Sequence, residues 1–156
     1  MASKNPKSKK KIQIYNLIKK SLDKDEKMLS SWKENSIVSQ FNKRKKNELQ
    51  IINRNFYHII SQAMKINKKT NGKLDITVGK LINIWGFGTR EKPTIYPSMK
   101  KIQNNMFDFG SRHLKIIKKN SKIYLTKDIN GIEINLSTLG EGFATDHISY
   151  ILKKKR

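Results

Sequence analysis

The chain has 156 residues, 36% of them hydrophobic, and carries 34 Lys and Arg against 12 Asp and Glu, a formal net charge of +22. This length and composition predict one folded domain, and the absence of cysteine excludes a disulfide framework, a thiolate metal site and a thiol nucleophile. No apolar run has the length of a signal-peptide core or a membrane span, so the sequence as written predicts a cytoplasmic protein.

The amino-terminal part is expected to be mostly helical. Residues 1–10 form a basic tail with little to bury, and we expect them to be disordered. Apolar residues then recur at helical spacing and predict a first helix from residue 11 to about residue 29. Residues 30–42 predict an ordered loop and a short turn of helix. Trp32 in this loop is either a lid over the core or a surface on which a flat ligand stacks.

The most periodic helix is expected between Leu49 and Met64, after a charged linker at residues 42–47. The segment ends in Lys-Lys-Thr-Asn-Gly, and a basic last turn followed by Asn-Gly is typical of a helix C-terminus. His58 has no partner at helical spacing, so we interpret it as a boundary residue rather than a ligand.

Residues 70–88, TNGKLDITVGKLINIWGFG, differ from the lysine-rich chain around them. The first two glycines interrupt what would be continuous helix, while Gly86 and Gly88 suit a positive φ or a close approach of the backbone to a ligand. Such a loop can hold the Asp75 carboxylate at a fixed point. The alternative is structural, because Asp before Ile-Thr-Val is also a common helix start.

The last third predicts a helix, strands and a final helix. A short helix is expected at residues 97–107, and alternating apolar residues predict strands at residues 113–117 and 122–126. The Asn-Gly turn at residues 130–131 is expected to join the second strand to residues 132–136 in a hairpin. Together these elements predict an α+β fold with helices packed on a mixed or antiparallel sheet.

Residues 135–146, NLSTLGEGFATD, combine a strand end, small residues and a helix start. This order offers free backbone N–H groups to a phosphate. Glu141 is awkward for direct phosphate contact. Its carboxylate suits a position near a metal ion or a ribose hydroxyl, or is a plain charge near the start of a helix.

The positive charge has two explanations. It usually indicates nucleic acid or an anionic surface as a partner. However, the chain has 29 Lys and only 5 Arg, with 22 Ile and 15 Asn, a combination that AT-rich codon usage produces on any solvated face. Arg is preferred for bidentate contacts to guanine and phosphate, so its scarcity argues against specific nucleic-acid binding.

Three segments together resemble the FAD:protein FMN transferases of the ApbE family. They are residues 29–42 (LSSWKENSIVSQFN), 72–88 (GKLDITVGKLINIWGFG) and 135–152 (NLSTLGEGFATDHISYIL), and their order and spacing match as well. The LSTxGEGxAxD form is similar to the enterobacterial branch, in which Glu stands where many other members carry Lys. The resemblance runs from about residue 12 to residue 152.

The resemblance implies a specific reaction. Family members bind FAD and Mg²⁺, cleave the pyrophosphate, attach FMN through a phosphoester bond to a Thr hydroxyl of a target protein and release AMP. Targets include flavoprotein subunits of Na⁺- or proton-linked redox pumps, and members are usually exported to the periplasmic face of the inner membrane. Most of the catalysis in such a phosphoryl transfer comes from charge neutralisation and alignment of the hydroxyl.

The resemblance also assigns positions. Thr138 matches the residue whose backbone carbonyl helps to hold Mg²⁺, and no catalytic residue is assigned. The positions that match FAD-contacting residues are Trp32, Lys73, Leu74, Asp75, Asn135 and Glu141. Family members often have Tyr at position 32, a small residue at position 73 and Asp at position 135.

Family members are considerably longer, so we expect residues 11–156 to be an incomplete ApbE-like domain. One backbone carbonyl cannot hold Mg²⁺, which takes about six oxygens. We therefore expect the chain alone to be a poor catalyst, marginally stable or self-associating. A second polypeptide that supplies the missing half would restore a working transferase. The alternative function is that of a non-enzymatic, lysine-rich binding protein.

Overall fold

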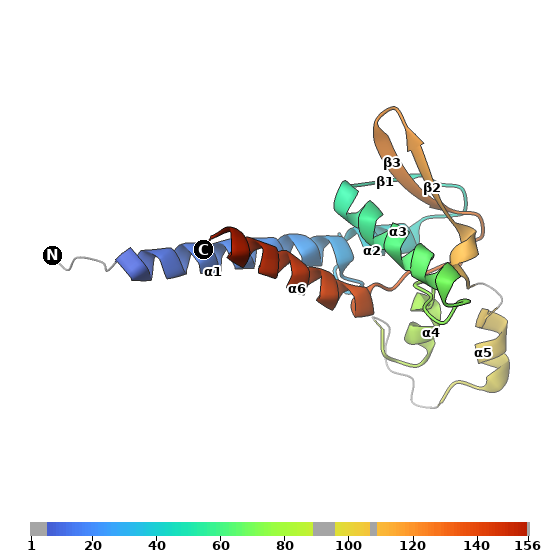
Figure 1. Cartoon of the computed structure of the whole chain (residues 1–156). Helices are drawn as coiled ribbons and strands as arrows, with labels where there is room; N and C mark the ends of the chain where they lie inside the picture. The colour runs from blue at the N-terminus through green and yellow to red at the C-terminus, as the bar shows by residue number, and fades with distance from the viewer. Residues whose placement is uncertain (1–5, 89–95, 107–108, 156) are drawn as a thin grey trace.

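The computed structural model describes residues 6–88, 96–106 and 109–155. Two long helices, α1 (Pro6–Leu29) and α6 (Ser137–Lys154), lie side by side and extend away from the rest of the molecule as an arm (Figure 1). Within the arm, the buried carboxylate of Asp25 lies 3.1 Å from Nδ1 of His147, and the Ser21 hydroxyl lies 3.1 Å from the same nitrogen. The two ends of the chain are therefore joined by a polar cluster as well as by packing.

The body of the molecule is built on a three-stranded antiparallel sheet in the order β1-β3-β2. Its strands are β1 (Gln50–Ile52), β2 (Leu114–Lys119) and β3 (Lys122–Lys127). The helices of the body are α2 (Ile37–Lys43), α3 (Arg54–Lys69), α4 (Gly79–Ile84) and α5 (Met99–Met106), and a 3₁₀ turn covers Ser111–His113. In the part of the chain that the structure describes, no helix combines the length and the apolarity needed to cross a bilayer.

The core lies where α2, α3, the sheet and residues 132–136 meet. Phe41 of α2 and Phe56 of α3 are fully buried, together with Leu125 of β3. Alternate residues of the extended segment add Ile132 and Ile134 to the same cluster. Burying side chains of this size contributes about 1.5–3 kcal/mol each, so this cluster fixes the segment that leads into α6.

Several expectations are confirmed. The fold is α+β, with helices packed on an antiparallel sheet. The end of the first helix at Leu29, the short α2 and the strands β2 and β3 all lie where the sequence predicts them. The basic last turn of α3 is followed by Asn71 at φ 50° and Gly72 at φ 81°, the left-handed ending expected there.

The prediction that residues 6–10 are disordered is wrong, because α1 already begins at Pro6. Proline is common in the first position of a helix, and lysine is a good helix former. Residues 1–5 lie outside the described part of the chain.

The predicted start of the next helix, at Leu49, is also wrong. Gln50 and Ile52 pair with β3 instead, and the helix begins only at Arg54. Asn53 adopts an extended conformation, and its side chain accepts a hydrogen bond from the Phe56 N–H at 2.8 Å. This side-chain cap defines the helix start, which the apolar spacing did not reveal.

The prediction that the second strand pairs with residues 132–136 in a hairpin is wrong. β3 pairs with β2 on one side and β1 on the other, so both of its edges are occupied. The chain turns between β2 and β3 at Asn120 and Ser121, which both have positive φ (50° and 58°), as the favoured two-residue hairpin turn requires. Residues 132–136 are extended and alternately buried as expected, but they lie outside the sheet.

Candidate functional site

Two motifs far apart in the sequence meet side by side. The Asn135 N–H donates to the carbonyl of Ile76 at 2.8 Å, and the Gly79 N–H donates to the carbonyl of Glu133 at 2.9 Å. Val78 and Glu133 form a parallel bridge between these bonds. The glycine-containing stretch at residues 70–88 and the start of the last motif are therefore joined through their backbones.

Glycine is required at this junction. A Cβ atom on Gly79 would lie 2.7 Å from the carbonyl oxygen of Glu133, which is too close for any side chain. Gly86 has φ 78°, as its position in the Trp-Gly-Phe-Gly sequence predicts. A Cβ atom on Gly88 would lie 1.8 Å from Oδ1 of Asn83, so the predicted close approach is made to a side chain of the protein itself.

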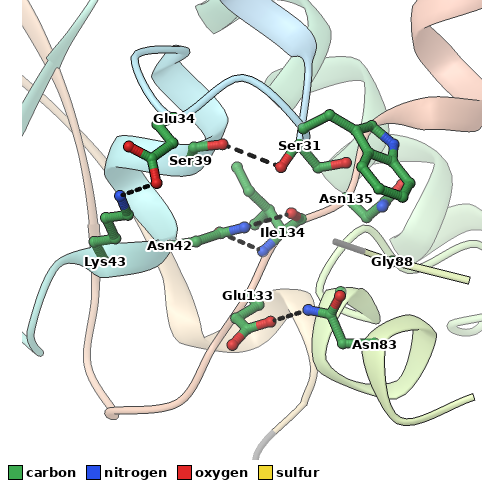
Figure 2. Close-up of a pocket in the computed structure, with 12 residues that line it drawn as sticks. Ser31, Glu34, Ser39, Asn42, Lys43, Asn83, Gly88, Glu133, Ile134 and Asn135 are labelled. Atoms are coloured by element: carbon green, nitrogen blue, oxygen red, sulfur yellow. Dashed lines mark hydrogen bonds and ion pairs between the residues drawn. The ribbon is translucent and has the colours of Figure 1, made fainter. Parts of the chain in front are cut away.

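A cavity of about 400 Å³ lies beside this junction, and we call it the motif cavity. Four parts of the chain line it: the loop before α2, α2 itself, α4 with its C-terminal turn, and residues 133–135 (Figure 2). Trp32 and Asn135, two of the residues predicted to contact FAD, both line this cavity. The structure therefore brings the first and the last motif to one concave surface.

The walls of the motif cavity are held by side-chain pairs that Figure 2 shows. Nδ2 of Asn83 donates to Oε2 of Glu133 at 2.7 Å, which ties α4 to the extended segment. Lys43 at the end of α2 lies 3.9 Å from the Glu34 carboxylate, and both side chains are largely exposed. The cavity therefore contains two carboxylates, one ammonium group and several neutral amides.

The loop that carries Trp32 is fixed by serine side chains. The Ser30 hydroxyl accepts hydrogen bonds from the backbone N–H groups of Trp32 (3.1 Å) and Lys33 (3.2 Å). The Ser39 hydroxyl donates to the carbonyl of Ser31 at 3.2 Å, and the Ser36 hydroxyl to that of Ser30. The loop is ordered as predicted, yet the indole of Trp32 remains 66% exposed. A rigid, exposed aromatic ring favours the stacking surface over the lid.

Trp32 also lines a second cavity of about 520 Å³, between α1 and the first turns of α6. Glu141 lines this second cavity and is exposed. The helix α6 begins at Ser137, so Glu141 lies within the helix rather than in a turn before it. Its role in binding FAD stays a prediction.

The Asp75 carboxylate is saturated with hydrogen bonds from the protein. Oδ1 accepts from the N–H and hydroxyl of Thr77 (2.8 and 2.7 Å) and from the hydroxyl of Ser111 (2.9 Å). Oδ2 accepts from Nδ2 of Asn67 (3.0 Å) and from the N–H of Ser111 (2.9 Å). Partial burial raises the pKa of this carboxyl, but the hydrogen bonds from Thr77 and Ser111 outweigh burial and hold the pKa below its usual value. These bonds give Asp75 a structural role, but not the expected helix start, because the residue before α4 is Val78 and no side chain caps that helix. A contact of Asp75 with FAD stays a prediction.

Three of the predicted positions, Lys73, Leu74 and Thr138, do not line the motif cavity. Lys73 is exposed and Leu74 is half-buried beside Asp75. Asn135 lines the cavity, although its Oδ1 already accepts a hydrogen bond from the Ser137 N–H at 3.0 Å. Thr138 is exposed in the first turn of α6. In an α-helix the carbonyl of residue 138 is directed along the axis toward the amide of residue 142.

A complete Mg²⁺ site is not formed by the residues that the structure describes. No group of three or more His, Asp or Glu side chains comes together among them. Mg²⁺ needs near-octahedral oxygen ligands, and the Thr138 carbonyl supplies at most one.

The sequence model of the ApbE family matches residues 6–156. The chain belongs to the ApbE family. An FAD:protein FMN transferase of Buchnera aphidicola subsp. Schizaphis graminum (strain Sg) is 60% identical over 144 residues, covering 92% of this chain and 42% of that protein. The FAD:protein FMN transferase of Escherichia coli (strain K12) is 32% identical over 148 residues, covering 95% of this chain and 42% of that protein.

The fold agrees with that of solved ApbE proteins. The flavin transferase ApbE from Vibrio cholerae superposes with a TM-score of 0.84 and 28% sequence identity, covering 92% of this chain and 45% of that one. The family and the fold expected from the resemblance are thus confirmed. The chain spans about 42% of the length of the curated relatives described above.

Several residues of the motif cavity were not predicted from the sequence. Asn42, Asn83 and Glu133 were not singled out, although each fixes a wall of it. A signal existed for Asn42, because an amide at the end of a short amphipathic helix is placed to bond a neighbouring backbone. Glu133 gave no signal, since a lone Glu in an alternating segment is typical of the solvated face of a strand.

Proposed function

We propose that this chain provides part of the FAD site of an FAD:protein FMN transferase. The observation that carries the proposal is the meeting of Trp32 and Asn135 on the motif cavity, at the backbone junction of the two glycine-containing motifs. An exposed indole on an ordered loop suits stacking on a flat ring system. The amides that line the same cavity suit hydrogen bonding to ribose or adenine.

The reaction that follows from this proposal is a phosphoryl transfer. A Thr hydroxyl oxygen of the target protein forms a bond to the FMN phosphorus of FAD, the bond from that phosphorus to the bridging oxygen breaks, and AMP leaves. The Thr proton is released to water during the transfer. The described residues would bind and orient FAD, whereas Glu34 and Glu133 repel a pyrophosphate unless a cation lies between them.

Magnesium and the target belong to the proposal as well. Mg²⁺ would neutralise the pyrophosphate charge, with the Thr138 carbonyl as one ligand and further ligands from outside the described residues. The target would be a flavoprotein subunit of an ion-linked redox pump, modified at the periplasmic face of the inner membrane.

The test is equilibrium binding of FAD to the purified chain, followed by flavin fluorescence with and without Mg²⁺. Trp32→Ala should weaken binding about tenfold through loss of stacking. Trp85→Ala is the matched control, because Trp85 is 43% exposed at the end of α4 and lines neither cavity that Trp32 lines. Equal effects of the two variants, or no binding in either condition, would contradict the proposal.

A further inference from the structure

A third cavity, of about 560 Å³, lies between the first turns of α3 and the end of the β2–β3 hairpin. We call it the hairpin-end cavity, and it shares no lining residue with the motif cavity. Its lining contains four permanent cations and one histidine but no Asp or Glu. These five residues are Arg54, His58, Lys118, Lys119 and Lys122.

Among the described residues the four cations have no carboxylate partner, whereas a few cations elsewhere on the surface do. Lys33 and Lys115 lie 2.6 and 3.3 Å from carboxylate oxygens, and Arg44 lies 3.8 Å from one. Within the described residues, none of the four cations of the hairpin-end cavity has a carboxylate within 4.0 Å. A lysine-rich composition explains why cations lie on many faces, but it does not explain why no Asp or Glu lines this concave face.

Three of these cations occupy electrostatically unfavourable positions. Lys119 and Lys122 are direct cross-strand partners at the hairpin turn, and like charges placed opposite each other destabilise a strand pair. Arg54 is the first residue of α3, where the helix dipole disfavours a cation, and no acidic residue lies in that first turn. All three of these cations line the same cavity.

Lys118 is positioned on the cavity wall by an aromatic ring. Its Nζ lies 4.5 Å from the centroid of the Tyr57 ring. A hydrogen bond with Lys118 also lowers the pKa of the Tyr57 phenol, with a smaller contribution from Ser61. The ammonium group is thereby oriented without being neutralised.

We propose that the hairpin-end cavity binds a small anion that carries a terminal phosphate. Such a group has a charge of about −1.5 to −2 near neutral pH and three strong acceptor oxygens, which match guanidinium and ammonium donors. The volume lies within the usual range of about 300–1,000 Å³ for small-molecule sites. The cavity is bounded by two short segments, residues 54–58 and 118–123, which suits a compact anion better than a polymer.

The experiment is a titration of the full chain with inorganic pyrophosphate, followed by the amide resonances in ¹⁵N-correlated spectra. We expect saturable shifts at residues 54–58 and 118–123. The variant Arg54→Gln with Lys119→Gln should bind about tenfold more weakly. The control Lys19→Gln with Lys20→Gln removes the same charge from exposed positions of α1 and should change the affinity less than about twofold.

A thermal measurement keeps the proposal testable without activity. Pyrophosphate should raise the melting temperature of the unmodified chain more than that of Lys119→Gln, in which the cross-strand repulsion is already relieved. Equal weakening in both double variants would show diffuse attraction to lysine and would overturn the proposal. Tighter binding of a ten-nucleotide single strand, or shifts confined to the motif cavity, would also overturn it.

Discussion

The side chain of Asn42 pairs with both backbone groups of Ile134, as a neighbouring strand would. The Ile134 N–H donates to Oδ1 at 2.8 Å, and Nδ2 donates to the Ile134 carbonyl at 3.0 Å. Ile134 is fully buried, so neither backbone group has access to water in place of this amide. At Ile134 the extended segment is therefore paired with a side chain rather than with a neighbouring strand.

Asn42→Ala should lower the free energy of unfolding by about 2–4 kcal/mol, because it leaves a buried donor and a buried acceptor without partners. Urea denaturation measures this loss. Asn16→Ala is the control, since Asn16 is exposed on α1 and its substitution should change stability by less than about 0.5 kcal/mol. Equal losses in the two variants would contradict the pairing role.

Gly79→Ala and Gly142→Ala should have opposite effects. The first places a Cβ atom 2.7 Å from the Glu133 carbonyl oxygen, whereas the second meets nothing within 4 Å in the middle of α6. We expect Gly79→Ala to destabilise the chain by about 1–3 kcal/mol and Gly142→Ala to stabilise it by about 0.5–1 kcal/mol. Melting temperatures of the two variants test this, and a stabilised Gly79→Ala would show that the junction is not tight.

Asp75→Asn should destabilise the chain, because an amide NH₂ would face N–H and O–H donors now bonded to the carboxylate. The pKa of Asp75 is lowered in the folded state, so its contribution to stability is present above the usual value of 3.8 and is lost as the pH falls through the folded pKa. We expect a loss of about 2–4 kcal/mol at pH 7, measured by urea unfolding.

The same variant should flatten the acid limb of the stability curve below pH 4. Asp23→Asn, at an exposed position of α1, is the control and should leave that limb unchanged. An unchanged acid limb in Asp75→Asn would mean that Asp75 does not carry the pH dependence.

Lys127 should make stability increase at alkaline pH. Its ammonium group is buried and donates to the carbonyls of Ile132 (2.8 Å), Asn42 (3.2 Å) and Phe41 (3.3 Å). Burial lowers its pKa to about 8 from 10.5, against a smaller opposing effect of Glu133 and Glu48. Between these values the unfolded chain holds a proton that the folded chain has released, so stability rises with pH across this window and this contribution is constant below it.

The rise is at most about 1.4 kcal/mol per pH unit, and Lys127→Met should abolish it. Lys19→Met, at an exposed position of α1, keeps the rise and corrects for changes in net charge. Guanidinium denaturation between pH 7.5 and 10.5 measures the slopes. Parallel slopes for the two variants would refute the buried-amine explanation.

The sequence predicts elements well where the pattern is local. The turn at Asn71 and Gly72 and the strands β2 and β3 follow from residue type and periodicity alone. The sequence fails to predict an element where a partner distant in the chain determines the local structure. Ile52 fits a helical pattern but pairs with Ile123, and Ile134 fits a hairpin strand but pairs with the side chain of Asn42.

The residues of the candidate site likewise fall into those that the sequence predicts and those that depend on distant partners. Trp32 and Asn135 are identified by motif resemblance and do meet at one cavity. The saturation of the Asp75 carboxylate could not be foreseen, because Ser111 lies 36 residues away in the sequence. The carboxylate–amide pair of Glu133 and Asn83 is invisible for the same reason, since its partners are 50 residues apart.

Asp75 accepts hydrogen bonds from Thr77 and Ser111, and the Gly110 N–H donates to the Thr77 hydroxyl at 2.7 Å. These bonds close the chain between Asp75 and Ser111 into a loop with a fixed base. Closing a loop twice as long costs only about 0.6 kcal/mol more. Insertions or deletions between Gly88 and Gly110 should therefore leave the sheet and the motif cavity in place. We therefore expect the length of this stretch to matter less to the fold than its base at Asp75, Thr77 and Ser111.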